Sequence, residues 1–223
     1  MIINKRILLK ISGEFLGAPP EFKSMDKIIT FINKLLNISC KISIVVGGGN
    51  LIRGREFSQN RVISDQMGMI ATIINSLAIQ NNISNSTCFS SIPMMGICDQ
   101  YNFIQAKNMF DNGRVVLFAG GIGNSHCSTD VCAVIRALEM ECDFVLKMTS
   151  AKGIFDSDPK INPQAKFIEE ISYKEVIDRN LHVMDIAAIA IARDSDLKIL
   201  IFSLDSVIDD MFTNRTSFSL IRP

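Results

Sequence analysis

The sequence predicts an α/β protein in which helices cover a mainly parallel sheet. Two observations support this fold class: short strand-like apolar runs alternate with helix-like stretches from end to end, and clusters of glycine or charged residues follow several of the runs. Open parallel sheets bind ligands at the carboxyl ends of their strands, so these clusters mark candidate sites. With 223 residues, of which 48% are hydrophobic, the chain is long enough for one sizeable domain, and we expect residues 1 to 223 to form it.

The expected strands are short apolar runs, and the expected helices have apolar residues at a spacing of three or four. Strands are predicted at residues 6 to 11, 42 to 46, 86 to 90, 115 to 119, 143 to 147 and 198 to 202. Helices are predicted at residues 25 to 36, 67 to 78, 131 to 138 and 185 to 193. Residues 150 to 166 contain a glycine, aspartates and two prolines, which favour a projecting hairpin or loop.

The charge balance and cysteine usage narrow the class of protein. The 23 basic and 23 acidic side chains cancel, so the chain lacks the positive charge typical of proteins that bind nucleic acid or anionic lipid, and a small-molecule ligand is favoured. Six cysteines occur without a CxxC pair and only two histidines are present, which indicates reduced thiols in a cytoplasmic protein and no zinc site. The amino terminus is interrupted by charges, and no apolar run approaches the roughly 18 residues needed to cross a membrane.

Two clusters follow the first two predicted strands. In ILLKISGE, Lys10 can deliver a positive charge to a phosphate, and Gly13 allows close approach of the backbone; a solvated lysine at a strand end is the alternative. In VVGGGN, the triple-glycine turn at residues 47 to 49 can bring backbone N–H groups close to a ligand, and the guanidinium of Arg53 can bind phosphate oxygens. The alternative for this turn is a flexible loop. Neither a Walker A sequence nor a complete G-x-G-x-x-G pattern is present.

The third cluster, AGGIGNSHCSTD at residues 119 to 130, leads into a predicted helix. Small polar residues at a helix start bind anions well, although Ser128 or Thr129 can equally serve as an ordinary helix cap. Asp130 follows at the positive end of the helix dipole and can orient lysines that hold a phosphate.

The fourth cluster is LKMTSAKGIFDSDP at residues 146 to 159. Lys147 closes a strand, Thr149 can donate a hydrogen bond, and Phe155 can pack beside a flat ring in a loop that also presents Asp158; a surface loop with one anchoring aromatic residue is the alternative. Asp65 precedes a helical stripe, so it can start a helix or bind a ribose. The two histidines suggest neither a catalytic triad nor a metal site.

Taken in order, these clusters resemble the amino acid kinase family, and within it the bacterial uridylate kinase branch. Five segments carry the resemblance: KRILLKISGE (5 to 14), VVGGGNLIRG (45 to 54), RVISDQMGMIAT (61 to 72), LKMTSAKGIFDSDP (146 to 159) and VMDIAAIAIARD (183 to 194). The resemblance implies a three-layer α/β/α sandwich around a mainly parallel central sheet, ATP as phosphate donor, UMP as acceptor and UDP as product. It also implies a homohexamer built from dimers.

The resemblance further implies roles at the matched positions. Lys10, Arg53 and Asp130 are the implied catalytic group, with Asp130 organising the lysines. The positions implied to bind ATP are Lys10, Ile11, Ser12, Gly13, Gly49, Arg53, Lys147, Thr149, Phe155 and Asp158. The positions implied to bind UMP are Gly48, Asp65, Ile122, Gly123, Asn124, Ser125, His126, Cys127, Ser128 and Thr129.

Phosphoryl transfer fits these residue types, because it depends mainly on in-line positioning and on neutralising charge. The acceptor is already a phosphate anion, so no general base is required. We expect magnesium to arrive on the nucleotide and no metal ligands from the protein.

Two departures from the family pattern limit the assignment. Ile122 stands where relatives have a threonine near uracil, so a specifying hydroxyl is missing and UMP selectivity is less secure than kinase chemistry. Residues 17 to 23 and 79 to 84 lack features linked to activation by GTP, and we expect weak or no activation. Two alternatives remain: a family member that phosphorylates a small carboxylate or carbamate such as acetylglutamate, glutamate or aspartate, and a non-catalytic oligomer that binds nucleotide or oxyanion.

Overall fold

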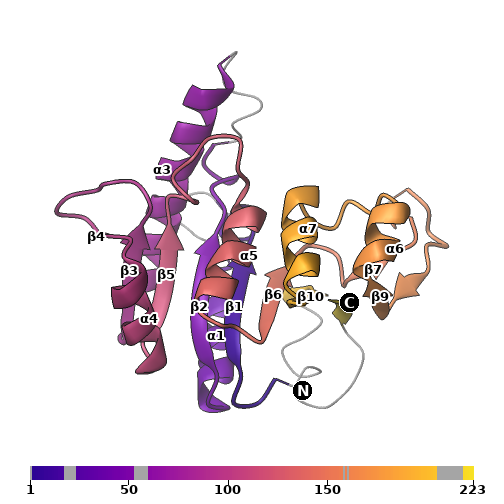
Figure 1. Ribbon diagram of the computed structural model, residues 1–223, viewed down its shortest axis with the longest axis horizontal. Coiled ribbons are helices and arrows are strands. Elements are labelled where there is room, and N and C mark those ends of the chain that lie inside the picture. The colour runs from indigo at the N-terminus through magenta and orange to yellow at the C-terminus, as the bar shows by residue number, and fades with distance from the viewer. Residues whose placement is uncertain (1, 18–23, 53–59, 158, 160, 205–217) are drawn as a thin grey trace.

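Helices cover both faces of a mainly parallel sheet in the computed structural model, which describes residues 2–17, 24–52, 60–157, 159, 161–204 and 218–223 (Figure 1). Within these residues, nine strands form the main sheet in the order β4-β3-β5-β2-β1-β6-β10-β11-β9. Only the β10–β11 pair is antiparallel among the pairs of this sheet. The predicted fold class is confirmed.

The elements of the described chain have the following bounds. The strands are β1 Arg6–Ile11, β2 Lys41–Val46, β3 Ser86–Ser90, β4 Asp99–Gln100, β5 Val115–Ala119, β6 Phe144–Met148, β7 Ile154–Phe155, β8 Phe167–Ile168, β9 Glu170–Ser172, β10 Lys198–Phe202 and β11 Phe218–Arg222. The α-helices are α1 Met25–Asn37, α3 Arg61–Gln80, α4 Phe103–Asp111, α5 Thr129–Glu139, α6 Tyr173–Asp178 and α7 Ile186–Asp194, and a 3₁₀ helix, η1, covers Gly13–Phe15.

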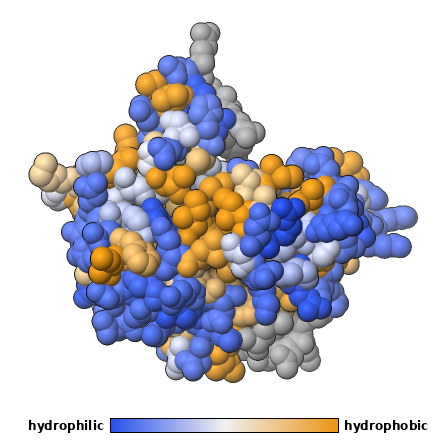
Figure 2. All heavy atoms as spheres, viewed as in Figure 1, coloured by the Kyte–Doolittle hydropathy of each residue, from blue (hydrophilic) through white to orange (hydrophobic). Residues whose placement is uncertain are grey.

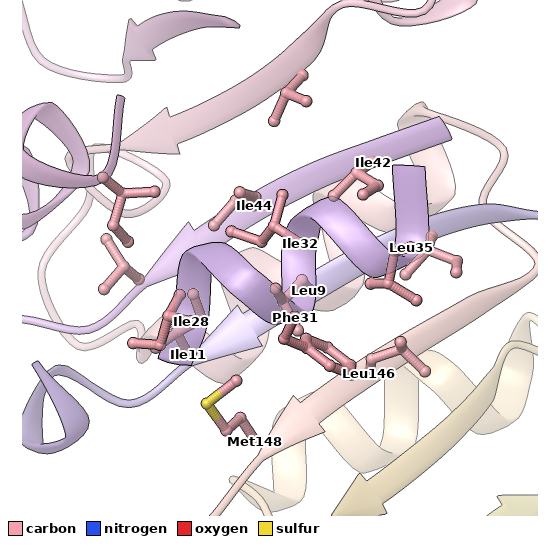
Figure 3. Close-up of a cluster of buried hydrophobic side chains, with 14 of the residues drawn as sticks. Leu9, Ile11, Ile28, Phe31, Ile32, Leu35, Ile42, Ile44, Leu146 and Met148 are labelled. Atoms are coloured by element: carbon pink, nitrogen blue, oxygen red, sulfur yellow. The ribbon is translucent and has the colours of Figure 1, made fainter. Parts of the chain in front are cut away.

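The three layers follow from two hydrophobic cores, one on each face of the sheet. On one face, α1 and α3 pack against alternate residues of the central strands; Figure 3 shows Phe31 and Ile32 of α1 against Leu9, Ile44 and Leu146. On the other face, α4, α5, α6 and α7 pack against the intervening residues of the same strands. A central strand buried on both faces has to be apolar nearly throughout, which is why these strands appear as short continuous runs in the sequence.

The six predicted strands are confirmed to within one residue at each end, and the four predicted helices are present. The prediction for residues 150 to 166 is also confirmed, because β7 and β8 pair as an antiparallel hairpin at the ends of that segment. The elements α4, α6 and β11 were not predicted. They are short or carry polar residues, and tertiary packing decides their structure.

No uninterrupted apolar run of about 18 residues is present, but α3 has the length and the mean hydropathy of a helix that could cross a membrane. A search for uninterrupted apolar runs missed it, because polar residues are spaced along the helix. In the structure 44% of the qualifying window is buried inside the protein, and α3 packs against β3 and β5. We therefore interpret α3 as a core helix that extends beyond the sheet, where Figure 2 shows apolar and polar side chains together.

The register of the central strands brings their carboxyl ends to one edge of the sheet. Strand β1 lies between β2 and β6, and Lys10 pairs directly with Lys147 across β1 and β6. Strand β5 lies on the other side of β2. The four predicted clusters begin at the ends of β1, β2, β5 and β6 and therefore meet at this edge.

Candidate active site

A buried cluster of three charged side chains lies at the carboxyl edge of the sheet. The Nζ of Lys10 is 2.9 Å from Oδ1 of Asp130, and the Nζ of Lys147 is 2.7 Å from Oδ2 of the same carboxylate. Each of the three residues is less than 10% exposed. Asp130 lies in the first turn of α5, so the helix dipole adds to the attraction of the two ammonium groups.

The two lysines favour the ionised form of Asp130. Burial alone would raise the pKa of Asp130, but the ammonium groups of Lys10 and Lys147 outweigh burial and lower this pKa to about 2. Burial lowers the pKa of Lys147, and the charge of Asp130 opposes that effect. Two lysine side chains and one carboxylate therefore lie together in a site of low solvent access.

Two backbone groups near the start of α7 complete the cluster. Lys147 donates a second hydrogen bond, at 2.7 Å, to the carbonyl of Val183, and the N–H of Asp185 donates to Oδ2 of Asp130 at 3.3 Å. Asp185 caps α7 by accepting from the N–H of Ala187. The resemblance to the family included residues 183 to 194 without a role, and the structure shows that this segment fixes Lys147.

Two glycines, one within the triple-glycine turn and one packed against it, have too little space around them for a side chain. A Cβ on Gly13 would lie 2.4 Å from the carbonyl oxygen of Gly47, and a Cβ on Gly48 would lie 2.8 Å from the Cβ of Ala71. Gly48 is therefore needed for contact with α3, which the sequence did not indicate. Among the described residues, only the side chain of Glu14 would lie within 4 Å of a Cβ on Gly49.

A pair of asparagines that the sequence analysis missed fastens this turn. Asn75, fully buried on α3, donates to the carbonyl of Gly47 and to Oδ1 of Asn50, both at 2.7 Å. Asn50 donates to the carbonyl of Gly17 at 2.7 Å. An asparagine inside the apolar stripe of a predicted helix was the available signal, since a buried amide requires partners.

Two cavities on the described surface adjoin the charged cluster on the side of the predicted phosphate donor. One, of about 420 Å³, is lined by Lys10, Ser12, Lys147 and Thr149 among others. The second, of about 480 Å³, shares Thr149 and Val183 with the first and also contains Phe155. Together they bring the predicted residues of the first and fourth clusters to one place.

Other predicted ATP-binding positions differ in what they can offer. The side chain of Ile11 is fully buried in the core, so only its backbone is available, and its carbonyl already accepts from the N–H of Gly47 at 2.9 Å. The hydroxyl of Thr149 donates to the carbonyl of Ala151 at 2.7 Å. Phe155 packs edge-on against Phe167 with ring centroids 5.5 Å apart. Arg53, Asp158 and residues 18 to 23 lie outside the described residues.

A third cavity, of about 140 Å³, contains predicted UMP-binding residues. It is lined by Gly48, Gly49, Asp65, Gly121, Asn124, Cys127 and Thr129, together with Ile52, Ser64, Gly68, Met69 and Thr72. We call it the acceptor cavity. Because Thr129 is the neighbour of Asp130 in the sequence, this cavity adjoins the charged cluster as well.

Asp65 faces the loop that precedes α5. Its Oδ2 accepts from the backbone N–H of His126 at 2.7 Å, and Arg61 contacts both carboxylate oxygens at 2.8 Å. Burial would raise the pKa of Asp65, but these contacts outweigh burial and lower it. The alternative role of Asp65 as a helix start was wrong, because α3 begins at Arg61 and is capped by Asn60.

Not every residue of the loop at 120 to 128 lines the acceptor cavity. Ile122 packs against the core formed by α4 to α7, and Ser128 caps α5 by accepting from the N–H of Val131. Gly123 approaches Ser91 closely. Ser125 and His126 are also not among the residues that line this cavity. The predicted set is therefore brought to one loop, but only part of it contacts the cavity directly.

A chain of hydrogen bonds from Arg136 through Ser91 connects this loop to the rest of the protein, and it was not predicted from the sequence. Arg136 is 5% exposed, forms an ion pair with Glu139 at 2.6 Å and stacks on the ring of Tyr101 at 3.5 Å from the centroid. It donates to the hydroxyl of Ser91 at 3.0 Å, and Ser91 in turn donates to the carbonyl of Gly121 at 2.7 Å. The signal was a lone arginine on the apolar face of a predicted helix.

Comparison with known proteins agrees with this geometry. A model of the amino acid kinase family matches residues 5–203. The chain is 46% identical over 211 residues to a uridylate kinase of Rickettsia bellii (strain RML369-C) and 42% identical over 212 residues to one of Shewanella sp. (strain ANA-3); each match covers 90% of this chain and 88% of the relative.

Two solved structures are similar over almost the whole chain. A UMP kinase from Bacillus anthracis superposes with a TM-score of 0.91 at 34% identity, covering 98% of this chain and 96% of the other. A UMP kinase from Ureaplasma parvum superposes with a TM-score of 0.91 at 32% identity, covering 99% of both chains.

Proposed function

Because the chain belongs to the amino acid kinase family, we propose that it is an enzyme that transfers the terminal phosphoryl group of ATP to UMP and forms UDP and ADP. The observation that carries this proposal is the buried cluster of Lys10, Asp130 and Lys147, which adjoins a large cavity on one side and the acceptor cavity on the other. The relatives named uridylate kinase support UMP as the acceptor. We place the reaction in the cytoplasmic synthesis of pyrimidine nucleotides, and residues 1 to 223 act as one domain.

The charged cluster addresses the main difficulty of the reaction, which is to bring two polyanions together. Lys10 and Lys147 line the cavity in which we place the phosphates of ATP, and Asp130 holds both ammonium groups at fixed positions. Preorganised charge of this kind stabilises the transition state because no rearrangement is needed when negative charge develops. Asp130 therefore acts as a positioning residue, and Lys10 and Arg53 are the cations that we assign to the transferred phosphate.

On the acceptor side, the cavity offers a carboxylate from α3 and the start of α5. Asp65 lies in the second turn of α3 and Thr129 is the first residue of α5. Helix starts attract phosphate, and a carboxylate accepts hydrogen bonds from ribose hydroxyls. We assign the ribose to Asp65 and the acceptor phosphate to the region between Gly49 and Thr129. Residues Ile122 to Ser128 hold the uracil side, mainly through their backbone.

Magnesium enters our proposal as the counter-ion of the nucleotide. Among the described residues, no three His, Cys, Asp or Glu side chains lie close enough to hold a metal, and both oxygens of Asp130 face lysines. The ligands of the ion would therefore be phosphate oxygens and water, and its chemistry would be to neutralise phosphate charge.

We also propose that the protein assembles into a homohexamer built from dimers, with α3 in a subunit contact. Ile63, Ile70 and Ile74 lie on one face of α3, and each is 46% exposed. Three large apolar side chains in one exposed stripe are typical of a surface that another protein covers.

A parallel assay tests the proposed reaction. Purified protein with ATP and magnesium is offered UMP, dUMP, CMP, AMP, acetylglutamate, glutamate and aspartate, and the release of ADP is measured. We expect turnover of UMP to exceed that of every other acceptor. Turnover of a carboxylate acceptor alone would instead support the small-carboxylate alternative, and no turnover with intact nucleotide binding would support the non-catalytic one.

Two variants connect the activity to the site. Lys10→Ala and Arg53→Ala should each lower the rate by well over tenfold, since each removes charge that stabilises the transferred group. Near-normal rates in both variants would contradict the assigned roles, while leaving the reaction itself established by the wild-type assay.

A further inference from the structure

Ser64 carries a hydroxyl that is buried without a hydrogen-bond partner. The residue is 0% exposed, and no described group lies within hydrogen-bonding geometry of its Oγ. Serine hydroxyls in helices often donate back to the carbonyl four residues earlier. Here the carbonyl of Asn60 accepts only the ordinary helical N–H of Ser64, at 3.1 Å, and receives no bond from the hydroxyl. A buried polar group without a partner is unfavourable and needs an explanation.

The position of Ser64 explains the missing partner, because the residue lines the acceptor cavity. Ser64, Gly68 and Thr72 follow one another at intervals of four on the face of α3 that packs against Gly48. The neighbouring polar side chains of this wall already have protein partners. The Thr72 hydroxyl donates to the carbonyl of Met69 and accepts from the N–H of Gly120, and Asp65 accepts from the N–H of His126.

We propose that the Ser64 hydroxyl forms a hydrogen bond with the sugar–phosphate part of the acceptor nucleotide and so contributes to acceptor specificity. This inference rests on the function proposed above. The sugar–phosphate part is favoured over the base, because Ser64 precedes the carboxylate assigned to the ribose and lines the same cavity as Thr129, at the helix start where we place the phosphate. A ligand with a polar group at this position would pair the hydroxyl, whereas an apolar ligand fragment would leave it without a partner.

The chain contains a matched control on the same helix. Ser76 is 1% exposed, and its hydroxyl also has no partner among the described groups. Unlike Ser64, it does not line any of the cavities described here. Ser64→Ala and Ser76→Ala therefore remove the same atom from equally buried positions. Only the first change alters the acceptor cavity.

The test measures UMP binding by calorimetry without ATP, the KM for UMP and for ATP, and thermal unfolding with and without UMP. We expect Ser64→Ala to raise the Kd and the KM for UMP about tenfold, as for loss of one hydrogen bond. The KM for ATP should stay within twofold. Ser76→Ala should leave all three constants within twofold.

Thermal unfolding separates a ligand contact from a structural role. Without UMP, neither variant should have a lower Tm than the wild type, because each removes a hydroxyl that has no partner in the folded protein. With UMP, the rise in Tm should be smaller in Ser64→Ala only. If Ser64→Ala does not fold, Ser64→Cys replaces the hydroxyl with a slightly larger thiol that is a weaker donor, and the same reduced response to UMP is expected.

Three outcomes decide the inference. Equal UMP affinity in Ser64→Ala and Ser76→Ala would overturn it. A loss of affinity for Ser64→Ala with both UMP and dUMP would support a contact with the phosphate or 3′-hydroxyl, and a loss with UMP alone a contact with the 2′-hydroxyl. A wild-type protein that does not bind UMP would overturn the proposed function itself, which separates that failure from this one.

Discussion

Asp130 has a more demanding environment than any other acidic side chain discussed here, since it is buried between two lysines and also accepts a backbone N–H. Removing one partner of a buried charged group leaves the others uncompensated, and this costs more than the loss of a surface pair. The consequences of changing Asp130 should therefore be visible in stability as well as in rate.

Replacement of Asp130 by asparagine should change how stability depends on pH. The folded-state pKa of about 2 is below the ordinary value of 3.8, so the carboxylate stabilises the folded state fully above pH 4 and loses this contribution as the pH falls toward 2. This contribution of the carboxylate to the free energy of unfolding amounts to about 2 kcal/mol. The free energy of unfolding of the wild type should exceed that of Asp130→Asn most at pH 5, and the gap should narrow by about that amount at pH 2.

Denaturant titrations of both proteins at several pH values between 5 and 2 measure this gap. A gap that stays constant over the range would show that the carboxylate is not held at a low pKa by the two lysines.

For single residues, the sequence indicated which side chains belong to the site but not which of them contact one another. Lys10, Asp130 and Lys147 were each selected as candidates with a plain structural alternative, and only the parallel order of β1 and β6 brings them together. The chain of hydrogen bonds from Arg136 to Gly121 was not predicted, because a side chain that acts through another one leaves no local pattern in the sequence.

Among the elements, α3 has the most functions. One face packs on the sheet, its first turns form a wall of the acceptor cavity, and Asn75 fastens the triple-glycine turn. A single straight helix therefore links the position of this turn to the position of Asp65.

Asn75→Ala should make the triple-glycine turn less firmly held against α3. The change leaves the carbonyl of Gly47 and the amide of Asn50 without their partner, and we expect the free energy of unfolding to fall by about 2 kcal/mol. The KM values for ATP and UMP should both rise, because the turn borders both of the nucleotide sites that we propose, whereas a defect confined to one side would raise only one of them.

Asn82→Ala is the matched control for this prediction. Asn82 is exposed just beyond the end of α3 and donates to the carbonyl of Ala78. Its loss should change stability by less than about 0.5 kcal/mol. Equal effects of the two changes in denaturant unfolding would show that the contacts of Asn75 have no special weight.

The elements themselves were largely predictable, for a physical reason. Central strands buried on both faces require continuous apolar runs, and helices that cover a sheet require apolar residues at a spacing of three or four. Strand β11 lacks such a pattern, and its structure depends on partners far away in the sequence. Helix α6 has only six residues, and its local signal is the capping box of Ser172 and Glu175 rather than an apolar stripe. The start of α3 was placed six residues late, because Asn60 and Arg61 carry no apolar periodicity.

At the scale of the whole molecule, the exposed stripe of α3 predicts association. The double variant Ile70→Asp/Ile74→Asp places two charges on this stripe, and burying them in a contact between copies would be unfavourable. We expect the molar mass measured by light scattering after size-exclusion chromatography to fall from that of the proposed hexamer to that of a smaller species.

Ile161→Asp serves as the control for this experiment. Ile161 is 82% exposed and lies in the loop between β7 and β8 rather than on α3. Its replacement should leave the molar mass unchanged. A double variant with the mass of the wild type would place the subunit contact elsewhere.

The pairing of Lys10 with Lys147 determines which insertions, deletions and substitutions in β1 and β6 preserve the site. Successive side chains of a strand point to opposite faces, so one residue inserted into or deleted from β1 or β6 would turn a lysine toward α1 and away from Asp130. Apolar residues of these strands can be exchanged for one another with a modest loss of packing. Mutations that alter the length of β1 or β6 would remove the charge cluster at once, even though the hydrophobic composition of the strand is unchanged.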